Sequence, residues 1–329
     1  MCMQRGLLLL LAMGVAAPGV AVPAVAQTPS AAAPADTQTR SAASIPDLSH
    51  VWTHPAFPWF EPPASGPGPI TNLSRWAEQR PGGSAGSAAL PPSKVGISNY
   101  DQLVGDYKNP ILQPWAAAVV KRYGEMSLAG ITFPNPSNQC WPFPMPFIYK
   151  QQTVQLIQQP DKITMLYSGQ NEIRRVRLNE PHPSPLTPSW YGDSVGHYEG
   201  DTLVVDTVGV KTDRPYAMLD LFGTPYTDKL RVVERYRLRD YDEVKDALDR
   251  NRKENWLFNG DVWTRHRSEK FLQLHVTIED AGVYTTPWTA TLTYAPGGDQ
   301  VGEGVCAENR HEYYNNKESD VPKAEKPDF

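Results

Sequence analysis

The fold is decided by the stretch DSVGHYEGDTLVVDTV, residues Asp193–Val208. Polar and apolar residues alternate on both sides of the triplet Glu199-Gly200-Asp201, which is typical of two β-strands joined by a tight turn. Similar runs recur at short spacing, and about eight antiparallel strands of this kind predict a mainly β protein, either a barrel or a sandwich. The further runs are Thr153–Gln158, Lys162–Ser168, Asn171–Leu178, Leu230–Leu238, Leu272–Glu279, Thr289–Tyr294 and Val301–Cys306.

Composition divides the 329 residues into five segments. The 32 prolines are about twice the usual share and exclude a helical bundle, because an interior proline breaks a helix. The segments are 1–26, a signal peptide; 27–44, a disordered linker; 45–150, an irregular proline-rich segment packed on the barrel, with one helix within 109–126 and a short strand at Leu48–Trp52; 151–310, an antiparallel β-barrel with a helical insertion near 241–255; and 311–329, a polar tail.

The N-terminus carries the features of a cleavable signal peptide. Arg5 precedes an apolar run at Leu7–Ala16, too short to span a bilayer, and Ala24-Val25-Ala26 forms an A-x-A cleavage signal. We expect cleavage after Ala26 and a periplasmic or secreted protein; the alternative is an uncleaved anchor. No later stretch is apolar enough to span a membrane, and the net charge of −5 gives no basic patch for nucleic acid.

Export also bears on the cysteines. Cys2 leaves with the signal peptide, and Cys140 and Cys306 remain. Two thiols in an oxidising compartment predict one disulfide bond. A thiol nucleophile or metal ligand is the alternative, but no CxxC or CxxH spacing supports it.

The hairpin carries the first candidate site. If Gly200-Asp201 form a two-residue turn, Asp193 and His197 share one face with Asp206. A carboxylate beside an imidazole orients it for acid/base catalysis. If the turn has three residues, Asp206 moves to the face opposite His197 and the site is lost. The turn length stays open, and so does the alternative that His197 is an ordinary surface histidine.

Glu234 is the second candidate. It lies in the run Leu230–Leu238 on the face whose other residues are apolar, so it is expected to point inward. A buried carboxylate must be paired, hydrogen-bonded or protonated. Glu234 is therefore either a general acid or base, or a structural carboxylate paired with an inward arginine.

The remaining patterns concern ligands. The sequence has no GxSxG, Walker A or GxGxxG motif and no HxH or HExxH spacing, so we expect neither a metal nor an organic cofactor. Aromatic residues can line a substrate pocket or fill the core. The candidates for substrate binding are Trp190, Tyr191, Tyr198, Tyr236 and Trp288.

Several blocks resemble a large family of uncharacterised secreted bacterial proteins that are rich in β-structure. The resemblance implies export and a β-barrel of lipocalin-like shape, with no settled activity. It covers most of residues 47–309, and the EGDTLVVDT block within the hairpin is its most specific part. The matching blocks are Asp47–Trp52 (DLSHVW), Asn109–Val120, the Cys140 segment, Pro188–Gly192, Ser194–Thr207, Val232–Arg235, Val276–Trp288 and Val305–Asn309.

The chain also departs from that family pattern. The family usually has histidine where this chain has Asp193 and Tyr226, arginine at His197 and tryptophan at Tyr198. If those family histidines carry chemistry, this chain has either lost it or rebuilt it with His197.

Three functional hypotheses follow. The first is a secreted β-barrel enzyme that hydrolyses, isomerises or eliminates a small apolar or aromatic molecule by acid/base chemistry, using His197, Glu234, Asp206 and Asp193. The second is a periplasmic binding or carrier protein in which the same groups only orient a ligand. The third is an envelope structural protein with a filled core.

Overall fold

The computed structural model describes residues 45–54, 60–63, 66–73, 103–213, 217–254, 268–297, 301–302 and 304–306. The expected signal peptide, linker and polar tail (1–26, 27–44 and 311–329) lie outside these residues.

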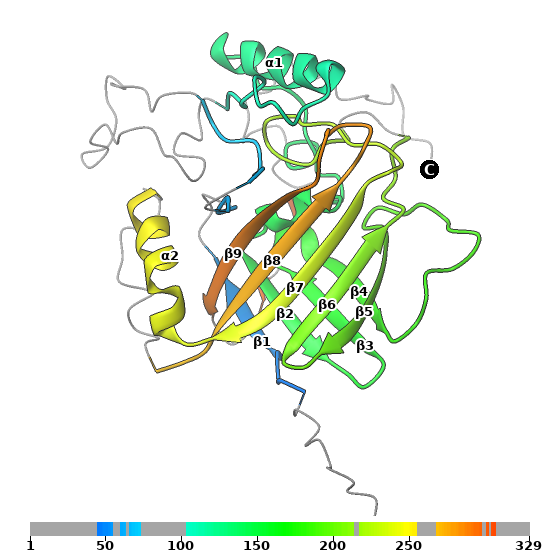
Figure 1. Ribbon diagram of the computed structural model, residues 1–329, viewed down its shortest axis with the longest axis vertical. Helices are drawn as coiled ribbons and strands as arrows, with labels where there is room; N and C mark the ends of the chain where they lie inside the picture. Colours follow the sequence, from blue (N-terminus) through cyan, green and yellow to red (C-terminus); the bar gives the residue numbers. More distant parts are fainter. Residues whose placement is uncertain are drawn as a thin grey trace, which may run out of the picture. The chain divides into compact units, whose positions relative to one another are not determined.

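Within the described residues, nine strands close into one barrel (Figure 1). Each strand pairs with the next along the chain, and the last pairs with the first. The predicted mainly β fold is thus confirmed as a barrel, not a sandwich. The strands are β1 (His50–Thr53), β2 (Thr153–Gln158), β3 (Lys162–Tyr167), β4 (Glu172–Leu178), β5 (Asp193–Glu199), β6 (Thr202–Val208), β7 (Arg231–Arg239), β8 (Phe271–Glu279) and β9 (Trp288–Pro296).

The odd number of strands fixes one feature of the topology. Strands that alternate in direction throughout can close only an even-numbered ring, so a nine-stranded ring needs a parallel pair. β4 and β5 form it, with Val176 opposite Ser194 and Leu178 opposite Gly196. The expected antiparallel barrel is therefore confirmed except at this one parallel pair. The connection 179–192 carries the chain from the end of β4 back to the start of β5, because parallel neighbours cannot be joined by a tight turn.

The β5–β6 hairpin has the two-residue turn. Glu199 lies opposite Thr202, and Val195 lies opposite Asp206. Gly200 takes a φ of +62°, a left-handed conformation that costs glycine little. The register that the first candidate site required is therefore correct. Whether that site forms depends on which face of the hairpin points into the barrel.

In the part of the chain that the structure describes, two helices and two short 3-10 helices accompany the strands. They are α1 (Pro114–Leu128), α2 (Tyr241–Glu254), η1 (Phe147–Lys150) and η2 (Gly169–Asn171). α1 starts at a proline, which suits a first turn because its missing N–H has no partner there anyway. α2 follows β7 and packs Val244 and Leu248 against Phe271 and Ala295. No described helix combines the length and apolar character needed to cross a membrane.

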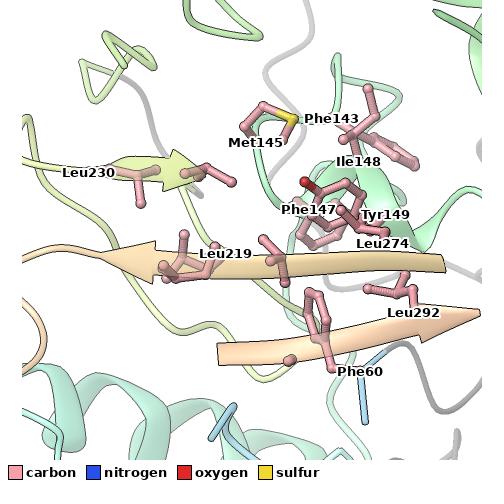
Figure 2. Close-up of a cluster of buried hydrophobic side chains, with 14 of the residues drawn as sticks. Phe60, Phe143, Met145, Phe147, Ile148, Tyr149, Leu219, Leu230, Leu274 and Leu292 are labelled. Atoms are coloured by element: carbon pink, nitrogen blue, oxygen red, sulfur yellow. The ribbon is translucent and has the colours of Figure 1, made fainter. Parts of the chain in front are cut away.

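The barrel core includes side chains from the segment before β2. Phe147 and Tyr149 in η1 have no exposed surface. Phe60 packs edge-on against Tyr149 and Trp288, with ring centroids 6.0 and 5.6 Å apart. Figure 2 shows Phe60, Phe147 and Tyr149 within one buried apolar cluster. We refer to residues 143–150 as the inserted segment, because they fill part of the interior.

The barrel closes where β1 pairs with β9, and this pairing is short. β1 and β9 share two residue pairs, Trp52 with Pro296 and Thr53 with Ala295. By contrast, β7 and β8 pair over the full nine residues of each strand. The β1–β9 contact is therefore the shortest seam of the ring.

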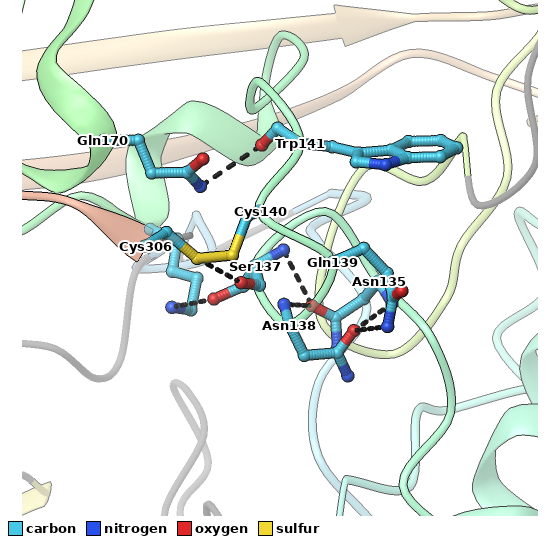
Figure 3. Close-up of a disulfide and its surroundings, with 9 residues drawn as sticks. Asn135, Ser137, Asn138, Gln139, Cys140, Trp141, Gln170 and Cys306 are labelled. Carbon is cyan, nitrogen blue, oxygen red and sulfur yellow. Dashed lines mark hydrogen bonds between the residues drawn. A yellow bond between two sulfur atoms is a disulfide. The ribbon is translucent and has the colours of Figure 1, made fainter. Parts of the chain in front are cut away.

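The chain after β9 forms a disulfide, not a further strand. Cys306 is bonded to Cys140, with Cα atoms 5.4 Å apart, which confirms the predicted bond (Figure 3). Gly304 exchanges hydrogen bonds with the Asn171 side chain at 3.1 and 3.2 Å. The expectation that Val301–Cys306 closes the sheet is wrong, because these bonds hold its end beside η2 and β1 takes the closing position.

Candidate functional site

A buried ion pair lies inside the barrel between β4 and β7. Arg174 and Glu234 are 1% and 0% exposed. The guanidinium donates from Nη1 to Glu234 Oε1 at 2.8 Å and from Nη2 to Oε2. The hydroxyls of Tyr149 and Tyr236 donate to Oε1 at 2.6 and 2.7 Å. Glu234 thus points inward as predicted, and it has the inward arginine partner that the structural alternative required.

Every polar group of this cluster has a partner. The guanidinium also donates to Ser194 Oγ at 3.0 and 3.1 Å and to Thr207 Oγ1 at 2.7 Å. Burial, followed by the charge of Glu234, raises the pKa of Tyr149 and Tyr236 well above the ordinary value, so both hydroxyls remain proton donors. Because Glu234 is fully buried and ion-paired with Arg174, its carboxylate serves as a structural anion.

The other three predicted catalytic residues lie on the outside of the barrel wall. Asp193, His197 and Asp206 share one face of the β5–β6 hairpin, as expected, but this face is opposite to the buried one. His197 Nε2 lies 3.1 Å from Glu199 Oε1 and not against Asp206. The wall therefore separates Glu234 from these three residues, and the expected four-residue site is not assembled.

The imidazole beside Asp193 and Asp206 is that of His182, in the β4–β5 connection. Its Nδ1 lies 2.6 Å from Asp193 Oδ2, and its Nε2 lies 3.7 Å from Asp206 Oδ2. Arg177 donates to both oxygens of Asp193 at 3.0 and 2.9 Å, and Arg231 donates to both oxygens of Asp206 at 2.9 Å. These contacts clamp the connection to the barrel wall, which is a structural role.

The five aromatic residues expected to bind substrate do not line one surface. Tyr236 and Trp288 are buried in the interior. Tyr198 is half-buried beside the hairpin turn. Trp190 and Tyr191 are half-buried just before β5, at the opposite end of that strand. Only the last two lie near the groups described next.

A second buried carboxylate lies where β4 begins. Glu172 is 4% exposed. It accepts the backbone N–H of Phe143 at 2.6 Å and the Gln151 Nε2 at 3.1 Å. Burial raises the pKa of Glu172 from 4.5 to about 7, against the opposing effects of these hydrogen bonds and of the Lys150 charge. A carboxyl group that titrates near neutral pH can both accept and release a proton there.

Lys150, the last residue of η1, is the basic counterpart of Glu172. Its Nζ donates to Ser137 Oγ at 2.8 Å and lies 5.6 Å from the centroid of the Phe143 ring. Burial lowers the pKa of Lys150 from 10.5 to about 8, and the charge of Glu172 opposes this shift. Perturbed pKa values that gather in one place are a mark of functional sites. We refer to Ser137, Lys150, Gln151 and Glu172 as the rim site, because Glu172 is the first residue of β4 and so lies where that strand begins.

The backbone around Ser137 is held by a polar turn. Asn135 Oδ1 accepts the N–H groups of Ser137 and Asn138 at 2.9 and 3.1 Å, and Asn138 Oδ1 accepts the N–H of Asn135 at 2.8 Å. The disulfide follows at Cys140 (Figure 3). The turn and the disulfide together fix the position of Ser137.

Comparison with known proteins finds no match to a family model, to a curated protein or to a solved structure. Within the part of the chain that the structure describes, no group of three or more His, Cys, Asp or Glu side chains could hold a metal ion. Function is therefore inferred from the geometry of the rim site.

One pattern in the sequence points to a part of the rim site. In the predicted strand Asn171–Leu178, Glu172 and Arg174 alternate in phase with Val176, and all three are buried. The alternation that placed Glu234 inside therefore also places Glu172 and Arg174 there.

Proposed function

We propose that this protein is an exported enzyme that moves protons to and from a small aromatic or apolar substrate at the rim site. The observation that carries this proposal is that a carboxyl group and an amine lie against the same buried residue: Glu172 accepts the Phe143 N–H at 2.6 Å, and Lys150 Nζ lies 5.6 Å from the centroid of the Phe143 ring. The reaction is a hydrolysis, an isomerisation or an elimination, and it uses no organic cofactor.

The two groups are suited to acid/base chemistry. An acid or base is most effective when its pKa lies near the working pH, because both protonation states are then populated. Glu172 and Lys150 have pKa values of about 7 and about 8. Because their charges interact, they titrate as a coupled pair. Each can therefore take up and release a proton near neutral pH, which an ordinary glutamate or lysine cannot do.

The neighbouring aromatic side chains support an aromatic or apolar substrate. Burial, followed by the charge of Glu172, raises the pKa of Tyr191, so the Tyr191 hydroxyl lies within electrostatic range of the Glu172 carboxyl. Trp190 precedes it and packs edge-on against Trp141, with ring centroids 5.9 Å apart. Aromatic rings offer a substrate large apolar contacts with defined geometry.

The test is turnover of a panel of small aromatic esters, lactones and enolisable ketones. We expect Lys150→Met to lower the rate about 100-fold or more, the usual contribution of an acid/base group, and Glu172→Gln to lower the rate as well. The matched control is Lys121→Met, because Lys121 lies on the exposed face of α1, 3.6 Å from Glu125, and should keep the wild-type rate.

Two results would contradict this function. Turnover that survives both Glu172→Gln and Lys150→Met would place the chemistry elsewhere. Binding of panel compounds without any product would favour the second candidate, a binding or carrier protein whose ligand lies at the same rim.

Export is part of the proposal. It is supported by the A-x-A signal at Ala24–Ala26 and by the Cys140–Cys306 disulfide, since such bonds persist in oxidising compartments. N-terminal sequencing of protein recovered from a periplasm should begin at Gln27. Protein that retains the leader would contradict cleavage.

A further inference from the structure

We propose that Ser137 is a nucleophile, that Lys150 is the base that activates it, and that the rim site hydrolyses small aromatic esters. This inference rests on the proposed function and names the reaction class for the same site. It starts from the 2.8 Å contact between Lys150 Nζ and Ser137 Oγ. A serine hydroxyl in hydrogen-bond contact with a lysine amine is one of the known arrangements for nucleophilic catalysis.

The nucleophile is held in place before a substrate arrives. The Ser137 backbone N–H is bound by Asn135 Oδ1 at 2.9 Å, and the disulfide at Cys140 lies three residues further along the chain. Ser137 is half-buried and therefore retains solvent contact. A fixed, reachable hydroxyl lowers the cost of orienting the attack.

The Lys150 amine can be neutral at the pH at which it must accept a proton. Because burial lowers the pKa of Lys150 to about 8, its amine is largely unprotonated in mildly alkaline solution. The charge of Glu172 raises that pKa, so Glu172 stabilises the ammonium that forms when Lys150 takes a proton. Glu172 is thus a positioning residue in this reaction.

The reaction balances with water as the only co-reactant. The neutral Lys150 amine takes the Ser137 hydroxyl proton as Oγ attacks the ester carbonyl carbon. The bond from that carbon to the leaving oxygen breaks, and the ammonium returns the proton to the departing alcohol. Lys150 then takes a proton from water, whose oxygen attacks the acyl carbon. Ser137 Oγ leaves, regains a proton from Lys150, and the carboxylic acid is released.

The experiment is covalent labelling with an aryl fluorophosphonate, which reacts with activated serine hydroxyls. The mature, disulfide-intact protein is treated between about pH 6 and 10, a range that brackets the lysine titration. Intact-mass measurement and peptide mapping then locate the adduct. We expect one adduct, on Ser137, whose rate of formation rises with an apparent pKa of about 8.

The variants separate the roles of the side chains. Ser137→Ala and Lys150→Arg should both abolish labelling, the second because arginine keeps the charge but cannot accept the proton. The matched controls are Lys121→Met and Ser189→Ala, because Ser189 is exposed and its Oγ bonds only Gly192 O, at 2.9 Å, among the contacts described. Both controls should label at the wild-type rate, and near-ultraviolet circular dichroism shows that each variant is folded.

Glu172→Gln tests the direction in which the pKa of Lys150 moves. Removing the negative charge lowers the pKa of Lys150 further, so the midpoint of the labelling profile should move to lower pH. An unmoved midpoint would mean that a different group is the base.

Failure of this inference can be told apart from failure of the proposed function. No adduct on Ser137 in folded protein, or wild-type turnover by Ser137→Ala, overturns the nucleophile. If Glu172→Gln and Lys150→Met still abolish turnover and the rate peaks between about pH 7 and 8, Glu172 is the base and Lys150 the acid. The proposed function then stands without Ser137.

Discussion

Arg174 holds Glu234 across the inner surface of four consecutive strands. The arginine extends from β4, contacts Ser194 of β5 and Thr207 of β6, and reaches the carboxylate on β7. One side chain therefore joins both members of the parallel strand pair to the two strands that follow. A buried ion pair of this kind is costly to break by removing one partner, because the other is left charged and unpaired.

Breaking this pair should be far more costly than removing both charges. We expect Arg174→Met to lower the free energy of unfolding by about 3–5 kcal/mol. The double variant Arg174→Met/Glu234→Gln should lose less than the sum of the single changes, since glutamine is neutral and still accepts from the tyrosines. Urea unfolding of all four proteins measures this coupling.

The outer wall offers a matched control for that cycle. Arg231 and Asp206 also form a bidentate ion pair, but both side chains are partly exposed to solvent. Their coupling should be about 0–1 kcal/mol. Additive effects at Arg174 and Glu234 would contradict the role given to the buried pair.

Glu172 should make stability depend on pH. Its pKa is raised from 4.5 to about 7, so the fold favours the protonated form, and the contribution present below pH 4.5 is lost as pH rises through about 7. At 1.36 kcal/mol per pKa unit, this group alone lowers stability by about 3 kcal/mol over that range. Glu172→Gln should flatten the profile of unfolding free energy against pH. An unchanged slope would contradict the assigned pKa.

The two histidines near the hairpin should respond differently to substitution. His182→Ala removes a 2.6 Å contact to Asp193 and should cost about 1–2 kcal/mol, because hydrogen bonds to charged groups are stronger than neutral ones. His197→Ala removes only an exposed contact to Glu199 and should change stability by less than about 0.5 kcal/mol. Thermal unfolding of both variants checks this order, and equal losses would contradict it.

The disulfide should matter for stability and for the rim site. It joins residues 166 apart, so Cys140→Ser/Cys306→Ser should lower the free energy of unfolding by roughly 2–4 kcal/mol. The same variant should label more slowly at Ser137, because the turn loses its anchor. Wild-type protein treated with a reductant is the control and should behave alike. A labelling rate that stays constant would show that the turn alone positions Ser137.

Local patterns predicted the hairpin well, because the turn residues determine it. A Gly-Asp pair between alternating runs predicted the hairpin and left two registers open, and the structure has the one with a two-residue turn, in which Val195 lies opposite Asp206. The parallel pair could not be predicted in this way, since it follows from the total number of strands and from which strand closes the ring.

The inward face of the hairpin was the harder question. Leu203, Val204 and Val205 are three apolar residues in a row, so the alternation leaves both faces of β6 open. In β7 the alternation is clean, and Glu234 was placed correctly. His197 was assigned to a site on the wrong side of the wall for this reason.

The rim site depends on contacts that no periodicity encodes. Ser137 and Lys150 lie outside any strand, and Lys150 shares its neighbour Phe143 with Glu172 because the chain before β2 folds back into the barrel. The disulfide was predicted from the compartment, but its place beside Ser137 became visible only in three dimensions.

The short seam between β1 and β9 also has a kinetic consequence. A ring opens first where the fewest backbone bonds must break, and here that place joins the strands nearest the two chain ends. Amide hydrogens at Thr53 and Ala295, which face each other across this pairing, should therefore exchange with solvent sooner than those in the middle of β7. The disulfide joins the chain beyond β9 to Cys140. It therefore keeps the end of β9 close to the barrel when the β1–β9 pairing opens, and the pairing should form again quickly.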